Sequence, residues 1–191
     1  AALTNDFELA KKMDLYRTHG ITRDPKNMKE QPHGPWYYQQ LELGFNYRMT
    51  DLQAALGISQ MSRLDEFVRA RHNLASNYDK VLERLNVKSP FQVKGAYSAF
   101  HLYIIKLKLN LIQKSHKETF EGLRAKGIGV NLHYIPVHMH PFYRTLGFQF
   151  GDFPKAEKYY SEAISLPMHY DLSTKDQLKV VEALSALISK E

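Results

Sequence analysis

The chain has 191 residues, and its 26 basic and 20 acidic side chains give a formal net charge of +6. Hydrophobic residues make up 43% of it and charged residues 24%, as is typical of a soluble globular protein. It contains no cysteine, which excludes disulfides and thiolate chemistry and is consistent with a cytoplasmic location. The basic residues form no stripe with aromatics, and no apolar run is long enough for a membrane helix. We therefore expect neither nucleic acid nor a membrane as a partner.

The N-terminal region predicts a strand, a helix and a long loop. Residues 1–4 are typical of the end of a strand, and Asn5 is expected to cap a helix that ends near His19. Residues 20–43 form a polar loop that contains prolines, and loops of this length are usually functional or disordered. The aromatic run at 36–38 indicates that this loop docks against another surface, such as a partner subunit.

The segment 44–56 joins a glycine-led loop directly to the start of a helix. Thr50 is a good N-cap, and Gln53 lies three residues further on, as a capping box requires. Free N–H groups and the helix dipole at such an N-terminus favour an anion, so Asn46 and Arg48 just before it could hold a phosphate. The residues alone also allow an ordinary capped helix with an entry loop.

The rest of the chain alternates helices and strands. Apolar residues at helical spacing predict one long helix over 51–85, with a bend at Gly57 or Ser62. Residues 86–191 predict a small α/β sandwich. Its expected elements are a strand over 99–109, a helix from its cap Ser115 to Lys126 with Gly127 as the C′ residue, a strand over 128–134, a helix from its cap Asp152 to Ala163, a strand over 164–166, and a final helix capped by Ser173.

Polar side chains gather at the end of the expected strand 128–134. On a strand, Asn131 and His133 project from one face, opposite Leu132 and Tyr134. The loop that follows could turn His133 or Tyr134 towards a ligand. The same pattern would arise if the imidazole and the phenol formed hydrogen bonds within the protein and contacted no ligand.

The imidazoles of His133, His138 and His140 raise the question of a metal site. Their spacing matches no standard zinc motif, and no acidic residue or cysteine lies between them. We therefore expect no metal site. A metallohydrolase built on this loop is the weakest functional alternative.

Several motifs resemble, in this order, one enzyme family. They are Thr4-Asn5-Asp6, Arg17-Thr18-His19-Gly20, the Asn46 segment, Gly127-Ile128 with His133-Tyr134-Ile135-Pro136, and Ile164-Ser165-Leu166-Pro167. Over essentially its whole length, the chain is similar to the DegT/DnrJ/EryC1/StrS sugar aminotransferases, which are fold-type I α/β enzymes dependent on pyridoxal 5'-phosphate. The resemblance implies a C-terminal part of such an enzyme, with 1–50 as the end of the large cofactor domain and its interface loop, 51–85 as a long connecting helix, and 86–191 as the small C-terminal α/β domain.

The resemblance also implies how the chemistry is divided. The lysine that binds the cofactor as a Schiff base would lie upstream of residue 1, so we expect no catalytic residue within 1–191 and an inactive fragment. Asn46 would reach the cofactor phosphate of the neighbouring subunit in a homodimer, assisted by Arg48. The residues expected at the sugar-nucleotide site are Asn131, His133 and Tyr134.

The aromatic loop narrows the expected substrate. Trp36-Tyr37-Tyr38, followed by Leu41-Glu42-Leu43-Gly44, resembles family members of the pseudaminic acid pathway. This resemblance implies amino transfer from an amino acid donor, glutamate, to C4 of a UDP-linked 4-keto-6-deoxy-N-acetylhexosamine. The alternatives are a dehydratase of the same family, in which another base replaces the lysine, and a non-catalytic module that binds a partner chain through 36–38 and the long helix.

Overall fold

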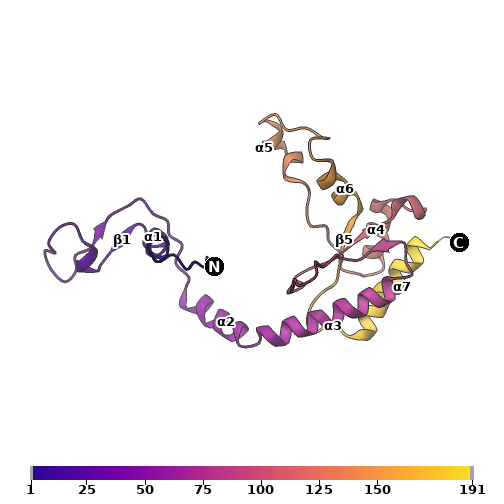
Figure 1. Ribbon diagram of the computed structural model, residues 1–191, viewed down its shortest axis with the longest axis horizontal. Coiled ribbons are helices and arrows are strands. Elements are labelled where there is room, and N and C mark those ends of the chain that lie inside the picture. Colours follow the sequence, from indigo (N-terminus) through magenta and orange to yellow (C-terminus); the bar gives the residue numbers. More distant parts are fainter. Residues whose placement is uncertain (1, 190–191) are drawn as a thin grey trace. The chain divides into compact units, whose positions relative to one another are not determined.

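Two units, Ala1–Ser62 and Arg63–Glu191, make up the chain in the computed structural model, which describes residues 2–189 (Figure 1). The division falls within the range 51–85 that the sequence predicts as one helix. The domain limits expected at residues 50 and 85 stay a prediction. No helix in the described part of the chain has both the length and the apolar character needed to cross a bilayer.

The first unit combines helices with a short antiparallel ribbon. Its elements in chain order are α1 (Phe7–Arg17), β1 (Ile21–Thr22), the 3-10 turn η1 (Pro25–Asn27), β2 (Gln39–Gln40) and α2 (Asp51–Met61). In the ribbon, Ile21 lies opposite Gln40. The buried Gln39 side chain accepts the N–H of Lys29 at 2.7 Å and donates to the Glu30 carbonyl at 3.0 Å. These bonds order the loop that the sequence left without structure.

Asp6, and not Asn5, caps α1. Its carboxylate accepts two N–H groups of the first turn, at 2.9 and 3.0 Å. The expected strand is wrong for residues 2–4, which have no regular structure, and residue 1 lies outside the described residues. The helix ends at Arg17, earlier than expected, because two of the next residues have positive φ angles.

The single helix expected over 51–85 is wrong. α2 ends at Met61, and a second helix, α3, runs over Leu64–Leu82. The interruption lies at Ser62, one of the two positions expected to bend, where the hydroxyl donates to the Ser59 carbonyl at 2.8 Å. Such a bond to the preceding turn competes with regular helical hydrogen bonding.

The second unit is built around an antiparallel sheet with the strand order β3-β4-β5. The strands are β3 (Val87–Lys88), β4 (Tyr103–Leu107) and β5 (Ala163–Leu166). β4 is shorter than the strand expected over 99–109, whereas β5 confirms the strand expected at 164–166. The register pairs Leu107 with Val87, and Tyr103 with Leu166.

Helices cover this sheet and enclose the core. α3 and α4 (His116–Ala125) both contact α7 (Thr174–Ile188), and α6 (Pro154–Glu162) contacts β4. The connections contain η2 (Leu109–Leu111), η3 (Val137–Met139) and the short helix α5 (Pro141–Arg144). The core contains the fully buried side chains of Tyr78, Leu82, Tyr103, Ile105, Leu107, Leu123, Ile164, Leu184 and Ile188.

Most of the expected helix ends in this unit are confirmed. Ser115 and Ser173 cap α4 and α7, and Gly127 follows α4 with a φ of 76°. Asp152 does not cap α6, and the N-cap is the next residue. The Asp152 carboxylate instead accepts the N–H of Gln149 at 2.7 Å, which holds the preceding turn.

The segment 128–134 is not the strand that its sequence predicts. Asn131 forms an isolated bridge with Ser165 of β5. The N–H of Ile128 donates back to α4 at 3.0 Å, and that of Val130 donates to Ile128 at 2.9 Å. Because these donors are used where the chain leaves α4, they cannot extend the sheet.

Candidate functional site

Backbone contacts hold the segment 44–47 against the end of α1. The N–H of Phe45 donates to the Tyr16 carbonyl at 2.7 Å, and Asn46 forms an antiparallel bridge with Thr18. The Asn46 side chain is exposed and forms no hydrogen bond to any residue of the range 2–189. The fold therefore fixes the backbone of Asn46 and leaves its amide available.

Glycines permit this close crossing. A Cβ on Gly44 would lie 2.2 Å from the Gly20 nitrogen, and a Cβ on Gly20 would lie 1.9 Å from the Glu42 carbonyl oxygen. Gly20 also has a φ of 70°, a conformation that favours glycine. The position of the chain that carries Asn46 and Arg48 thus depends on the absence of two side chains.

Arg48 lines a basic pocket in the first unit. The pocket has a volume of about 400 Å³, and its walls include His19, Arg23 and Tyr38. The guanidinium of Arg23 lies 5.7 Å from the centroid of the Tyr38 ring. No carboxylate lines the pocket, and among the described residues neither arginine forms an ion pair. This donor set suits a phosphate or a carboxylate.

Arg23 was not predicted from the sequence. The only signal is its place shortly after the His19-Gly20 turn, and that signal does not indicate a partner. Asn46, although predicted with Arg48, is not among the residues that line the pocket.

The N-terminus of α2 is less favourable for an anion than the sequence indicated. The capping box is confirmed, because Thr50 accepts the N–H of Gln53 at 3.3 Å and Gln53 accepts the N–H of Thr50 at 3.0 Å. The box uses one of the free N–H groups of the first turn, and the carboxylate of Asp51 lies in the same turn. An anion bound at this place would therefore be held mainly by side chains.

The second unit brings together two of the three residues predicted at the sugar-nucleotide site. Asn131 and His133 line a pocket of about 640 Å³ between the segment after α4, the end of β5 and the start of α7. His133 Nδ1 lies 2.7 Å from the Ser165 hydroxyl, which fixes the orientation of the ring. Tyr134 is 72% exposed and does not line this pocket.

Charged groups of both signs surround this pocket. Its lining includes Lys126, His169, Asp176 and Lys179. Lys179 donates to Asp176 at 2.8 Å, and this bond, with one from Ser173, holds the pKa of Asp176 below its ordinary value. The pocket therefore contains an ionised carboxylate at neutral pH beside two lysines, and these groups can bind the hydroxyls of a sugar.

His138 is engaged in a buried pair with Glu157, with 2.8 Å between Nε2 and the carboxylate. The same carboxylate oxygen accepts the N–H of Gly151 at 2.8 Å and that of Phe153 at 3.4 Å. Over residues 2–189, no group of three or more histidine or acidic side chains gathers at one point. His138 thus holds a loop in place and does not converge with His133.

The profile of the DegT/DnrJ/EryC1/StrS aminotransferase family matches residues 1–185. The chain therefore belongs to this family. It is 34% identical to the UDP-4-amino-4,6-dideoxy-N-acetyl-beta-L-altrosamine transaminase of Campylobacter jejuni over 193 residues, which covers 100% of this chain and 48% of that protein.

Solved structures share the fold. Helicobacter pylori PseC, an aminotransferase involved in the biosynthesis of pseudoaminic acid, has a TM-score of 0.85 at 26% identity, with 97% of this chain and 47% of that chain covered. Streptococcus pneumoniae Spr1654 in its PMP form also has a TM-score of 0.85 at 26% identity, over 96% of this chain and 46% of that one.

The chain spans about half the length of the curated relatives it matches. The comparisons confirm the predicted family and the predicted α/β fold of a sugar aminotransferase. The roles of Asn46, Arg48, Asn131, His133 and Tyr134 stay predictions.

Proposed function

We propose that the whole protein is a cytoplasmic, pyridoxal-phosphate-dependent aminotransferase of nucleotide-sugar biosynthesis. It transfers an amino group from an amino acid, glutamate, to C4 of a UDP-linked 4-keto-6-deoxy-N-acetylhexosamine. Membership of the family supports the reaction class, and the names of the Campylobacter and Helicobacter relatives support the substrate. The observation that carries the proposal is the basic pocket lined by Arg23 and Arg48. Arg48 lies two residues after Asn46, whose side-chain amide is available for a ligand.

The residues of the first unit fit the phosphate of the cofactor. Guanidinium groups bind phosphate oxygens through paired N–H donors, and an amide adds a further donor. Because no carboxylate lines the pocket, a dianion would meet no like charge there. Pyridoxal phosphate, when bound, supplies the electron sink for proton removal from the amino acid donor.

In this proposal the chain holds ligands and performs no proton transfer of its own. Asn46 donates to the cofactor phosphate of the neighbouring subunit, so a homodimer is needed for activity, and Arg48 with Arg23 balances the phosphate charge. His133, held by Ser165 through Nδ1, keeps Nε2 available for the sugar nucleotide. Asn131, which lines the same pocket, adds to that contact, whereas Tyr134 lies outside this pocket and would reach the ligand from its exposed position.

The test uses the protein expressed from its complete gene, with nitrogen-labelled glutamate and the UDP-linked 4-keto sugar. Appearance of the label in a 4-amino sugar supports the proposal. Loss of a sugar hydroxyl without transfer of nitrogen would show that the protein is a dehydratase of this family. If no product forms and the sugar nucleotide does not bind, the protein would instead be a non-catalytic module that binds a partner chain.

Variants address the phosphate contact. We expect Asn46→Ala and Arg48→Ala each to raise the Kd for pyridoxal phosphate about 10-fold or more, because a hydrogen bond to a charged group is lost. The exposed residue Asn5 supplies a matched control, since Asn5→Ala removes an amide that does not line the pocket. An unchanged Kd in both test variants would remove these residues from the cofactor site.

A further inference from the structure

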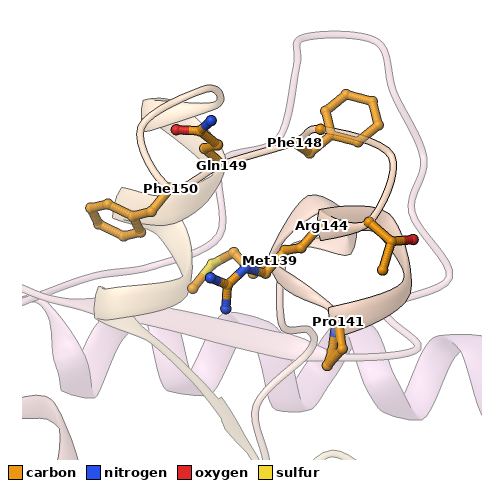
Figure 2. Close-up of a pocket in the computed structure, with 8 residues that line it drawn as sticks. Met139, Pro141, Arg144, Phe148, Gln149 and Phe150 are labelled. Atoms are coloured by element: carbon orange, nitrogen blue, oxygen red, sulfur yellow. The ribbon is translucent and has the colours of Figure 1, made fainter.

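Two cavities of the second unit differ in how their polar groups are arranged. The larger one has a volume of about 780 Å³ and lies in the connection between η3 and α6. Figure 2 shows that the rings of Phe148 and Phe150 point away from the Arg144 guanidinium, so these groups do not face one common ligand. In the pocket that His133 lines, by contrast, a buried hydroxyl is bonded directly to the imidazole.

We propose that Ser165 is a positioning residue that keeps the imidazole proton of His133 on Nε2. His133 then donates a hydrogen bond to the sugar nucleotide and binds an oxygen that can only accept one, such as a keto oxygen or a phosphate oxygen. This role of Ser165 rests on the proposed function, which supplies the sugar nucleotide as the ligand of the pocket. It gives the hydrogen bond a direction, which the position of His133 alone leaves open.

The Ser165 hydroxyl has one hydrogen-bond partner within residues 2–189, and that partner is Nδ1 of His133 at 2.7 Å. Ser165 lies in β5 and is only 3% exposed, so water does not replace a missing partner there. If the hydroxyl donates to Nδ1, its proton is bonded and the ring proton lies on Nε2. In the opposite arrangement Nδ1–H would donate to the hydroxyl, whose own proton would be buried without an acceptor, at a cost in free energy. The buried hydroxyl therefore selects the Nε2–H form.

The backbone around His133 is held from two sides, which keeps the imidazole against Ser165. Asn131 and Ser165 exchange backbone hydrogen bonds of 3.3 and 2.8 Å. The Arg124 guanidinium of α4 donates through Nε and Nη2 to the Val130 carbonyl at 3.1 and 2.8 Å. Because these contacts lie within three residues of His133, the imidazole is oriented before a ligand arrives.

Nε2 of His133 stays available to a ligand. No hydrogen bond between residues of the range 2–189 uses this atom, and His133 lines a pocket of about 640 Å³. The Tyr134 ring lies edge to face against the imidazole, with 4.7 Å between the ring centroids, and restricts its rotation. The Asn131 side-chain oxygen accepts the N–H of Leu132 at 2.8 Å, so the NH2 group of Asn131 adds a second donor to this pocket.

The first test locates the ring proton in the protein expressed from its complete gene and containing isotope-labelled histidine. Nuclear magnetic resonance spectra that correlate the ring nitrogens with the carbon-bound ring protons distinguish a protonated from an unprotonated nitrogen, and His133→Ala identifies the signals. At about pH 8.5, where a histidine of ordinary pKa is neutral, we expect the proton on Nε2. In Ser165→Ala the Nδ1 signal should shift, because this atom loses its donor. A proton on Nδ1 in the unchanged protein would overturn the proposal.

The second test measures, by calorimetry and without an amino acid donor, the Kd for the UDP-linked 4-keto sugar, for UDP and for pyridoxal phosphate. We expect Ser165→Ala to raise the Kd for the keto sugar about 5- to 10-fold, because the imidazole is no longer fixed with Nε2–H towards the pocket. Ser165→Thr keeps a hydroxyl and should restore most of the affinity, and neither variant should change the Kd for pyridoxal phosphate. A loss shared by UDP indicates a phosphate oxygen as the acceptor, and a loss confined to the keto sugar indicates an oxygen of the sugar.

A double-mutant cycle separates positioning of the imidazole from a general loss of stability. If Ser165 acts through His133, Ser165→Ala should not weaken binding further in the His133→Ala protein. Thr119→Val removes another fully buried hydroxyl, and Ser161→Ala removes an exposed one in α6. Neither residue lines the pocket, so both control variants should bind the sugar nucleotide as the unchanged protein does.

Three further results would contradict the role of Ser165 and leave the proposed function standing if the labelled 4-amino sugar still forms. They are additive effects in the cycle, a parallel loss of pyridoxal phosphate binding in Ser165→Ala, and unchanged ring signals with an unchanged Kd in that variant. Absence of the amine in the unchanged protein would instead refute the proposed function, and the ring spectra would still show where the proton of His133 lies.

Discussion

At the scale of single residues, the buried carboxylate of Glu157 holds three groups of the second unit through hydrogen bonds. Burial works against its charged form, but hydrogen bonds from His138 and from the Gly151 and Phe153 N–H groups outweigh burial and hold the pKa of Glu157 below its ordinary value of 4.5. A lowered pKa in the folded state means that the carboxylate stabilises the protein above pH 4.5. This stabilisation is lost as the pH falls below that value.

We therefore expect Glu157→Ala to lower the Tm by several degrees at neutral pH, because it leaves His138 and the two N–H groups without an acceptor. Glu157→Gln keeps an acceptor and should have a smaller effect. Thermal unfolding at about pH 6 and about pH 4 measures the linkage, and the difference between the unchanged protein and Glu157→Gln should narrow at the lower pH. A difference that stays constant would show that the charge of Glu157 does not stabilise the fold.

Gly20 and Gly44, where two backbone segments cross closely, allow a second prediction about single residues. Gly44→Ala should reduce the free energy of unfolding by about 1–3 kcal/mol, because the added Cβ meets backbone atoms that cannot move freely. Gly57→Ala is the matched control, since nothing lies within 4 Å of its added Cβ, and it should stabilise α2 by about 0.5–1 kcal/mol. Urea unfolding of the 191-residue chain measures the change in the free energy of unfolding for each variant. Equal changes in the two variants would contradict a close backbone crossing at Gly44.

At the scale of elements, Arg71 ties α3 to two distant segments. Its guanidinium donates to the carbonyls of Phe100, His101 and Met168 at 3.0, 3.0 and 2.9 Å. These bonds join a helix to the start of β4 and to the chain beyond β5. Such contacts to a charged donor are stronger than those between neutral groups.

We expect Arg71→Met to lower the free energy of unfolding by about 1–3 kcal/mol, because the carbonyls lose their shared donor. Arg69→Met, at an exposed position of the same helix, should change it by less than about 0.5 kcal/mol. Chemical unfolding followed by circular dichroism checks both changes. Similar values for the two variants would show that the bonds of Arg71 add no stability.

The helix caps and the segment 128–134 show which structural features the sequence predicts correctly and which it does not. Caps such as Ser115 and Ser173 depend on groups within three or four residues, so the sequence predicts them correctly. The segment 128–134 has the alternation of a strand, but its first N–H groups are used in leaving α4. The pattern of side chains does not report how the backbone donors are used.

At the scale of the whole molecule, the chain spans about half the length of the relatives it matches. We expect the Schiff-base lysine to lie outside residues 1–191. Borohydride reduction of the protein from its complete gene with pyridoxal phosphate, followed by peptide mapping, tests this expectation. We expect selective labelling of one lysine that lies outside this range. Stoichiometric labelling of a single lysine within residues 1–191 would mean that the active site has been placed wrongly.

The sequence by itself determined the family, the α/β class, most helix caps and the candidate residues Asn46, Arg48, Asn131 and His133. These features lie in short motifs, and short motifs depend on neighbours along the chain. Only the tertiary structure placed Arg23 beside Arg48 and His138 against Glu157, separated the expected long helix at Ser62 and left Tyr134 outside the pocket of His133. Contacts between residues far apart in sequence depend on the path of the backbone, which turns such as Gly20 and hydrogen bonds such as those after α4 decide.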